Sequence, residues 1–180
     1  MSIKYSENLY KYKRFNTRIV NIGGVPLGGS NPLRIQSMTT TNTMDTEDTI
    51  NQSIRIIKAG CEYVRVTAPS IKEAKNLNNI QNGLKFRGYN TPIIADIHFT
   101  PNAAEVAAQI VPKVRINPGN YADKKKFKTF EISDKDYNFE LERIYERFLP
   151  LVKICKENGT VLRIGTNHGS LSDRIMNRYG

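Results

Sequence analysis

The fold is set by residues 63–97, which read YVRVTAPSIKEAKNLNNIQNGLKFRGYNTPIIADI. Two short β-branched runs, Tyr63–Thr67 and Pro92–Ile97, are typical of buried strands. Between them, a stretch from Pro69 to Gly88 carries apolar residues at helical spacing, namely Ile71, Ala74, Leu77, Ile80 and Leu84. A strand, a helix and a second strand in this order predict a βαβ unit and hence a parallel sheet.

The same alternation repeats along most of the chain. The remaining predicted elements are, in order, strand Leu33–Met38, helix 45–60, helix 100–110, strand Lys113–Ile116, helix 139–158, strand Val161–Ile164 and the start of a helix at 171–179. Pro150 lies inside one of these helices and is expected to kink or restart it, because proline lacks the backbone donor. Residues 120–137 are polar and lysine-rich, which predicts an excursion at the functional face.

A hairpin is predicted ahead of the first strand of the sheet. Arg18–Gly29 has two apolar runs around Gly23-Gly24, and glycine supplies the positive φ that a tight turn needs. We expect the hairpin to cap one end of the domain. Residues 1–17 are then an N-terminal extension, and residues 18–180 form the domain itself.

The number of strands favours an incomplete barrel. Five predicted strands do not close an eight-stranded (β/α)8 barrel, which typically takes about 250 residues. An open doubly wound sheet would favour a glycine-rich loop after the first strand, yet Gln36-Ser37-Met38-Thr39-Thr40 contains no glycine. The sequence therefore predicts an α/β fold that is the first half of a TIM-type barrel with parallel strands, with the rest of the barrel absent.

Composition limits the class of protein and its partners. The 180 residues are 39% hydrophobic and carry a formal charge of +10. No apolar run approaches the roughly 20 residues that span a bilayer, and no signal peptide is visible, so we expect a cytoplasmic protein without membrane contact. Cys61 and Cys155 form no metal motif and are expected to be free thiols. The excess charge is compatible with nucleic acid or with phosphorylated metabolites.

Polar residues recur at the carboxyl ends of the predicted strands, where barrel enzymes build their sites. These candidate site residues are Arg65, Asp96, His98, Arg115, Asn117, Arg163, Asn167 and His168. Three of them are arginines between apolar neighbours, and the planar fork of arginine suits two phosphate oxygens at a time. Three arginines around one cavity indicate a diphosphate. In the alternative interpretation each arginine pairs with a buried acid such as Asp96, which would account for one arginine more easily than for three.

The two histidines are candidates for proton transfer or for binding a substrate hydroxyl group. Asp96 and His98 are two residues apart on a strand, so their side chains point the same way. His168 follows Asn167 in Gly165-Thr166-Asn167-His168-Gly169-Ser170, a loop whose backbone N–H groups can meet an anion ahead of a helix. Asp96, His98 and His168 are therefore the catalytic candidates.

Five ordered motifs together resemble the 4-hydroxy-3-methylbut-2-enyl diphosphate synthase family. They are Leu33-Arg34-Ile35-Gln36-Ser37-Met38-Thr39, Val64-Arg65-Val66, Ala95-Asp96-Ile97-His98-Phe99, residues 114–120 (VRINPGN) and residues 163–171 (RIGTNHGSL). The resemblance runs from about Arg18 to Gly180, and Ser170–Met176 is similar to the long, three-domain type.

This resemblance implies an oxidoreductase of the non-mevalonate route of isoprenoid (terpenoid) biosynthesis. It would convert 2-C-methyl-D-erythritol 2,4-cyclodiphosphate to the linear diphosphate by reductive dehydroxylation, with electrons from ferredoxin or flavodoxin. The resemblance implies that Arg65, Arg115 and Arg163 bind the diphosphate. It also implies a [4Fe-4S] cluster held by a C-terminal domain. Cys61 and Cys155 lie in no cluster motif, so no metal is expected in this chain.

The missing part of the barrel has two expected consequences. The fragment is expected to be inactive alone, and its uncovered strand edges favour self-association.

Two other functions compete with this interpretation. Another phosphate- or pterin-handling barrel, such as a dihydropteroate synthase-like enzyme, shares the fold and the arginines at the rim. A basic nucleic-acid-binding module is disfavoured because the aromatic residues are scattered and the strand arginines are recessed.

Overall fold

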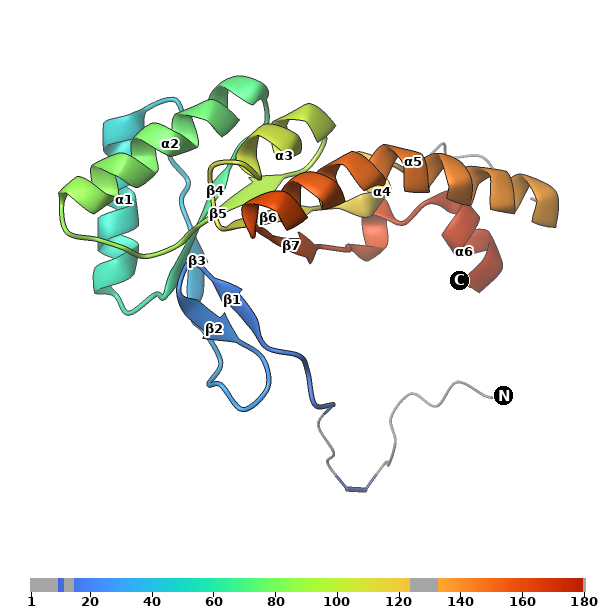
Figure 1. Ribbon diagram of the computed structural model, residues 1–180, viewed down its shortest axis with the longest axis horizontal. Coiled ribbons are helices and arrows are strands. Elements are labelled where there is room, and N and C mark those ends of the chain that lie inside the picture. The colour runs from blue at the N-terminus through green and yellow to red at the C-terminus, as the bar shows by residue number, and fades with distance from the viewer. Residues whose placement is uncertain (1–9, 12–14, 124–132, 180) are drawn as a thin grey trace.

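A five-stranded parallel sheet forms the centre of the protein in the computed structural model, which describes residues 10–11, 15–123 and 133–179 (Figure 1). Its strands are, in spatial order, β3 (Gln36–Met38), β4 (Tyr63–Thr67), β5 (Ile93–Ile97), β6 (Lys113–Ile116) and β7 (Val161–Ile164). Each strand is hydrogen-bonded to the next one in the sequence, and every pair is parallel. This unbroken order is that of a barrel wall, since a doubly wound sheet reverses its strand order.

The helices begin where the sequence provides caps. Their bounds are α1 Thr46–Lys58, α2 Ile71–Phe86, α3 Pro101–Ala107, α4 Pro118–Tyr121, α5 Asp134–Asn158 and α6 Asp173–Tyr179, with a 3₁₀ turn at His168–Ser170. The Asp45 carboxylate accepts a hydrogen bond from the Asp48 N–H and caps α1. Ser70 and Glu73 form a capping box at the start of α2. These caps satisfy backbone donors that a first turn leaves free.

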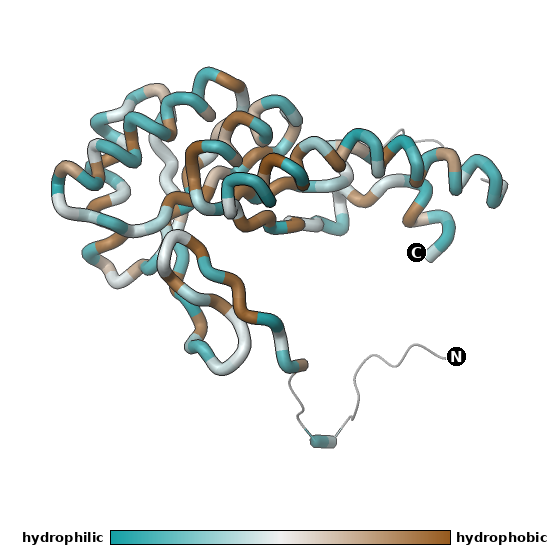
Figure 2. Tube along the Cα trace, in the orientation of Figure 1, coloured by the Kyte–Doolittle hydropathy of each residue, from teal (hydrophilic) through white to brown (hydrophobic). Residues whose placement is uncertain are grey.

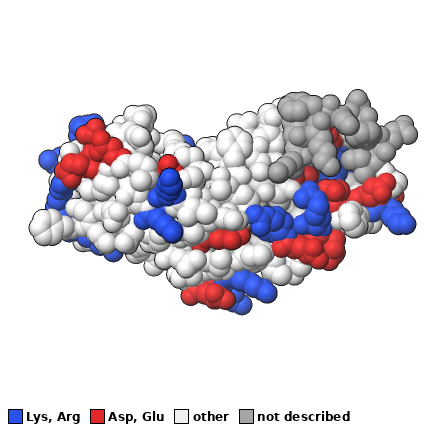
Figure 3. All heavy atoms as spheres, turned by 90° about the horizontal axis from the view of Figure 1, so that it is seen from above, with Lys and Arg blue, Asp and Glu red and all other residues white. Residues whose placement is uncertain are grey.

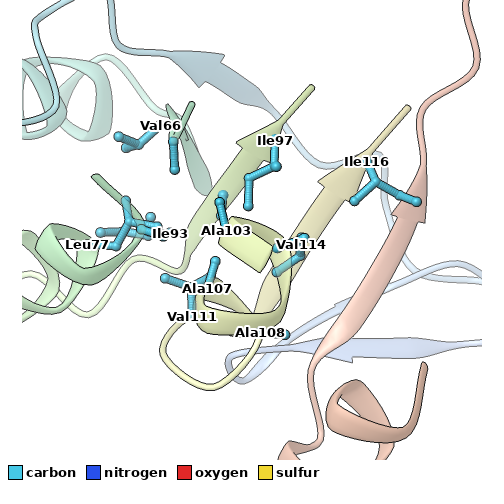
Figure 4. Close-up of a cluster of buried hydrophobic side chains, with 14 of the residues drawn as sticks. Val66, Leu77, Ile93, Ile97, Ala103, Ala107, Ala108, Val111, Val114 and Ile116 are labelled. Atoms are coloured by element: carbon cyan, nitrogen blue, oxygen red, sulfur yellow. The ribbon is translucent and has the colours of Figure 1, made fainter. Parts of the chain in front are cut away.

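One face of the sheet carries the hydrophobic core. Alternate strand residues such as Val66, Ile97 and Val114 pack against Leu77 of α2 and Ala103 of α3 (Figure 4). Helices α1, α2, α3 and α5 lie on this same side (Figure 1), and apolar segments gather between them and the sheet (Figure 2). Helices on one face only, together with sequential strands, leave the other face as the interior wall of the barrel.

The predicted hairpin is confirmed. Strands β1 (Val20–Ile22) and β2 (Val25–Leu27) pair antiparallel around the two glycines, and both glycines have positive φ. Ile22 is buried against Tyr63 and Ile94 on the interior face. Because Tyr63 opens β4 and Ile94 lies near the start of β5, the hairpin covers the amino-terminal end of the sheet.

Most predicted elements are confirmed, and the structure differs from the expectation in two places. The first strand is Gln36–Met38 rather than Leu33–Met38, and Leu33 is 82% exposed. Arg34 donates to the Pro26 carbonyl and to Glu62, which holds the preceding segment outside the sheet. Helix α5 starts at Asp134 and continues through Pro150 as one helix, so no restart occurs. In the described ranges no helix is long and apolar enough to cross a membrane.

Candidate anion-binding site

The interior face of the sheet is lined by charged residues. Along β4, β5 and β6 the residues that alternate with the core positions are Tyr63, Arg65, Ile94, Asp96, Lys113 and Arg115. On β7, Arg163 is the register partner of Arg115 and has the same place in the alternation. The strand arginines and Asp96 are thereby brought to one wall of the sheet, as the sequence predicts.

Asp96 is the centre of this cluster. Its carboxylate is 1% exposed, and Arg115 Nη1 donates to its Oδ1 atom at 2.9 Å. Arg65 Nε lies 3.3 Å from Oδ2, close enough for an ion pair, although the N–H direction does not form a hydrogen bond. Arg65 also donates to the Met38 thioether through Nη2 at 3.1 Å. A buried carboxylate needs such partners, because removing an unpaired charge from water costs several kcal/mol of desolvation free energy.

Arg115 is the most constrained side chain of the site. Besides Asp96, it donates through Nη1 to His98 Nε2 at 2.7 Å and through Nη2 to the Gly165 carbonyl at 2.9 Å. Since a guanidinium can only donate, Nε2 is the accepting nitrogen of the imidazole. A Cβ atom on Gly165 would lie 1.9 Å from Arg115 Nε, so any side chain at this position would displace the guanidinium. The guanidinium is thus fixed by β5, β6 and the loop after β7.

The alternative interpretation, in which the strand arginines pair with a buried acid, holds for two of the three arginines. Asp96 pairs with both Arg65 and Arg115. Arg163 is exposed and makes no ion pair with any described residue. Two cations therefore share one buried acid, and the third remains available to an external anion.

The loop after β7 is tied to the loop after β6. Asn117, which is buried, donates from Nδ2 to Ser170 Oγ at 2.7 Å, and its Oδ1 accepts from the Gly119 N–H. Asn167 Oδ1 accepts from the Gly169 N–H at 3.0 Å, which caps the 3₁₀ turn. Both asparagines thus shape the rim, and neither joins the cluster around Asp96. His168 is exposed on this rim.

Residues 17–180 match the model of the GcpE TIM-barrel domain. The chain belongs to this family. It is 58% identical over 174 residues to the 4-hydroxy-3-methylbut-2-en-1-yl diphosphate synthase (flavodoxin) of Bacteroides thetaiotaomicron, covering 96% of this chain and 28% of that protein. The enzyme of the same name from Leptospira interrogans is 54% identical over 180 residues, all of this chain and 27% of that protein. The chain thus spans under a third of the length of these relatives.

A solved structure supports the barrel fold of the GcpE domain. Dihydropteroate synthase of Xanthomonas albilineans, in complex with indole-2-carboxylic acid and 6-chloroguanine, aligns with a TM-score of 0.50 over 88% of this chain and 69% of that chain. The two sequences are 13% identical, so this likeness concerns the fold alone.

Sequence reasoning missed one charged residue of the GcpE domain's interior face. Lys113 is the first residue of β6, is 6% exposed, and lies two positions before Arg115. Its Nζ atom lies 5.6 Å from the centre of the Tyr63 ring, which places the ammonium group on the interior side. The signal was present, because residues two apart on a strand share a face.

The described part of the GcpE domain does not fit a [4Fe-4S] cluster. Among the described residues no group of three or more His, Cys, Asp or Glu side chains could hold a metal ion. Cys155 is packed in the core between α5 and the sheet, where burial raises the pKa of its thiol. Cys61 precedes β4, at the end of the sheet opposite Arg65 and Arg115. A cluster of this kind needs several thiolate ligands together.

Proposed function

We propose that this chain is the substrate-binding barrel of a 4-hydroxy-3-methylbut-2-enyl diphosphate synthase. The reaction converts 2-C-methyl-D-erythritol 2,4-cyclodiphosphate to the linear diphosphate: one carbon–oxygen bond to the diphosphate breaks and opens the ring, two electrons from the external donor and one proton are added, and one hydroxyl group leaves as water. The observation that carries this proposal is the set of Arg65, Arg115 and Arg163 on one interior wall, with only Asp96 as their acidic partner among described residues. A cyclic diphosphate presents two phosphoryl groups that match such an excess of fixed positive charge.

The side chains of the site have separable roles in this proposal. Arg65, Arg115 and Arg163 bind phosphoryl oxygens, and Asp96 fixes the first two in place. His98 is in contact with Arg115 and is partly exposed at the rim, where it is positioned to bind or protonate the departing hydroxyl group. His168, beside Asn167 on the neighbouring rim, is the second candidate for this proton.

The electrons enter from outside the described residues in this proposal. A [4Fe-4S] cluster supplies electron transfer in the whole enzyme, and its ligands are not found among the described residues. The relatives are named as flavodoxin-dependent enzymes, which favours flavodoxin over ferredoxin as the donor. We propose that the protein acts in the cytoplasm, together with its substrate and its electron donor.

The two competing functions receive less support. A pterin-handling enzyme shares the barrel with this chain, but its resemblance is limited to the fold. Binding of a nucleic-acid backbone needs a continuous basic surface. On the helix-covered side shown in Figure 3, Lys and Arg alternate with Asp and Glu instead.

Replacing Arg115 with alanine is expected to weaken binding of the cyclic diphosphate by at least tenfold. The variant loses a fixed guanidinium, and one charge-assisted hydrogen bond contributes about 1.5–3 kcal/mol. Isothermal titration calorimetry of the chain measures this, with a short single-stranded DNA as a second ligand and Lys75→Met on the exposed surface of α2 as a charge-matched control. Unchanged affinity in Arg115→Ala, or DNA binding that survives in it at equal strength, would contradict the proposal.

A further inference from the structure

A buried ion pair outside the anion site joins the segment after β6 to the segment after β7. Arg174 Nη2 donates to Asp123 Oδ2 at 2.8 Å, and both residues are more than nine-tenths buried. Asp123 directly follows α4, and Arg174 lies in the first turn of α6. The guanidinium also stacks on Tyr137 of α5, with its Cζ atom 4.6 Å from the centre of the ring. Helices α4, α5 and α6 therefore meet at one charged side chain (Figure 1).

This ion pair takes the place of a hydrophobic anchor for α6. Arg174 is the one buried residue of the helix, whose residues 173–179 are all described. No residue of α6 belongs to the hydrophobic clusters that the described residues form. A helix of seven residues does not persist without tertiary contacts. The position of α6 thus depends on a charged contact, which favours a single arrangement because a buried charge that loses its partner is left uncompensated.

The loop after β7 is fixed at both of its ends. At the strand, the Gly165 N–H group donates to a carbonyl of β6 at 2.7 Å. At the other end the loop is tied through the bond from Asn117 to Ser170 and then runs into α6, where Arg174 is held. His168 is exposed between these points, in a 3₁₀ turn whose backbone bonds are all local. Because so short a turn does not fix its own position, the place of His168 is set by the two ends of the loop.

We propose that Asp123 and Arg174 are positioning residues, which act through the loop after β7 to hold His168 at the rim of the anion site. This inference rests on the proposed function, in which the ligand lies against that rim. The two side chains lie outside the cluster around Asp96, so they act on the ligand only through the loop. Without the pair, α6 separates from α4 and the His168 ring leaves its place beside the ligand.

Nuclear magnetic resonance of the imidazole groups tests this role, because the chain has two histidines. In the wild-type chain, saturation with the cyclic diphosphate is expected to shift the signals of both His98 and His168. In Arg174→Met the His98 shift should remain, and the His168 shift should fall to roughly half or less, in proportion to the population of the fixed loop. A role limited to overall stability would change the two signals alike.

Arg178→Met is the matched control on the same helix. The Arg178 guanidinium stacks on the same Tyr137 ring, with its Cζ atom 4.3 Å from the centre, and pairs with Asp134 at 3.1 Å. This pair is exposed, and exposed ion pairs contribute little to stability. Both histidine shifts are therefore expected to stay in Arg178→Met.

A double variant, Asp123→Asn with Arg174→Met, keeps the test decisive if the single variant does not fold. It leaves no unpaired charge in the interior, and it is expected to lose the His168 shift as Arg174→Met does. Hydrogen exchange without ligand gives a second readout. The Leu171 and Ile175 amides, which bond within the turn and at the start of α6, should exchange roughly tenfold faster than in the wild type. The Gly165 amide, bonded to β6, should not change.

The outcomes separate this inference from the proposed function. Full shifts of both histidines in the double variant would overturn the positioning role and leave the proposed function standing. A wild-type chain in which His98 shifts and His168 does not would also overturn it, because the loop then does not meet the ligand. A folded wild-type chain in which neither histidine shifts would overturn the proposed function and this inference with it.

Discussion

Alanine in place of Gly119 is expected to lower the melting temperature by roughly 6–12 °C. Gly119 lies in α4 directly beneath the loop after β7, and a Cβ atom there would lie 1.7 Å from the Ser170 carbonyl oxygen. A backbone atom cannot move aside as a side chain does, so the two loops must separate. Overpacking of this kind costs about 3 kcal/mol or more, and each kcal/mol shifts a domain of this size by about 2–4 °C.

The sign of this prediction is opposite to that of helix propensity. Alanine in a helix is normally better than glycine by about 0.5–1 kcal/mol, so a neutral or stabilised Gly119→Ala variant would show that the two loops are not in close contact. Gly169→Ala is the matched control from the same rim, because its Cβ atom would meet Asn167 Oδ1 at an ordinary 3.5 Å. Circular dichroism melts of the two variants compare them directly.

Gly165→Ala is expected to weaken binding of the cyclic diphosphate by at least tenfold, although Gly165 carries no side chain. The new methyl group would displace Arg115 and break its hydrogen bonds to Asp96, His98 and the Gly165 carbonyl. Each bond to a charged group contributes about 1.5–3 kcal/mol, and 1.4 kcal/mol is a factor of ten in affinity. The fold itself should survive, because the clash is with a side chain.

A double-mutant cycle tests the reason for this loss. If Gly165→Ala acts through Arg115, it should weaken binding strongly in the wild-type chain and scarcely at all in the Arg115→Ala background. Additive losses in the two backgrounds would mean that Gly165 acts by another route. Gly169→Ala again controls for an added methyl group on the rim.

The strands with a compact β-branched run, and one helix with regular apolar spacing, could be predicted from the sequence. Strands β4, β6 and β7 begin and end at the predicted residues, because their β-branched runs are bounded by polar or turn-forming residues. Helix α2 was predicted from five apolar positions, four of which are buried. Local pattern and tertiary packing agree in these segments, so local reasoning sufficed.

The two differences, at the start of β3 and at Pro150 of α5, depend on contacts that a local pattern does not contain. Leu33 and Ile35 fit the apolar pattern of a strand. However, Arg34 forms an ion pair with Glu62 and donates to the Pro26 carbonyl, and Glu62 also accepts from the Ile35 N–H. These contacts hold the segment outside the sheet, so the strand begins only at Gln36. Helix α5 continues past Pro150 because Leu151, the next residue, is fully buried in the core. In both cases tertiary contacts outweigh the intrinsic preference of the segment.

The membership of the site was predictable, but its pairing was not. Strand position and alternation predicted that Arg65, Asp96 and Arg115 meet, because parallel strands end at one edge. That two arginines share one carboxylate is set by side-chain direction across three strands, which the sequence does not reveal. Lys113 was missed because it opens its strand, whereas the predicted site residues lie toward the carboxyl ends of the strands.

The most direct test of the anion site is to locate the bound ligand by nuclear magnetic resonance. Amide shifts of the ¹⁵N-labelled chain are followed as the cyclic diphosphate is added. The account predicts the largest shifts at residues 96–98, 115–119 and 163–170, at the carboxyl ends of the strands. A polar cleft at the opposite end of the sheet, lined by Lys85, Asn90, Gln109 and Asn158 among others, is the internal comparison. Shifts confined to residues 85–91, 109–112 and 158–160 would contradict the account.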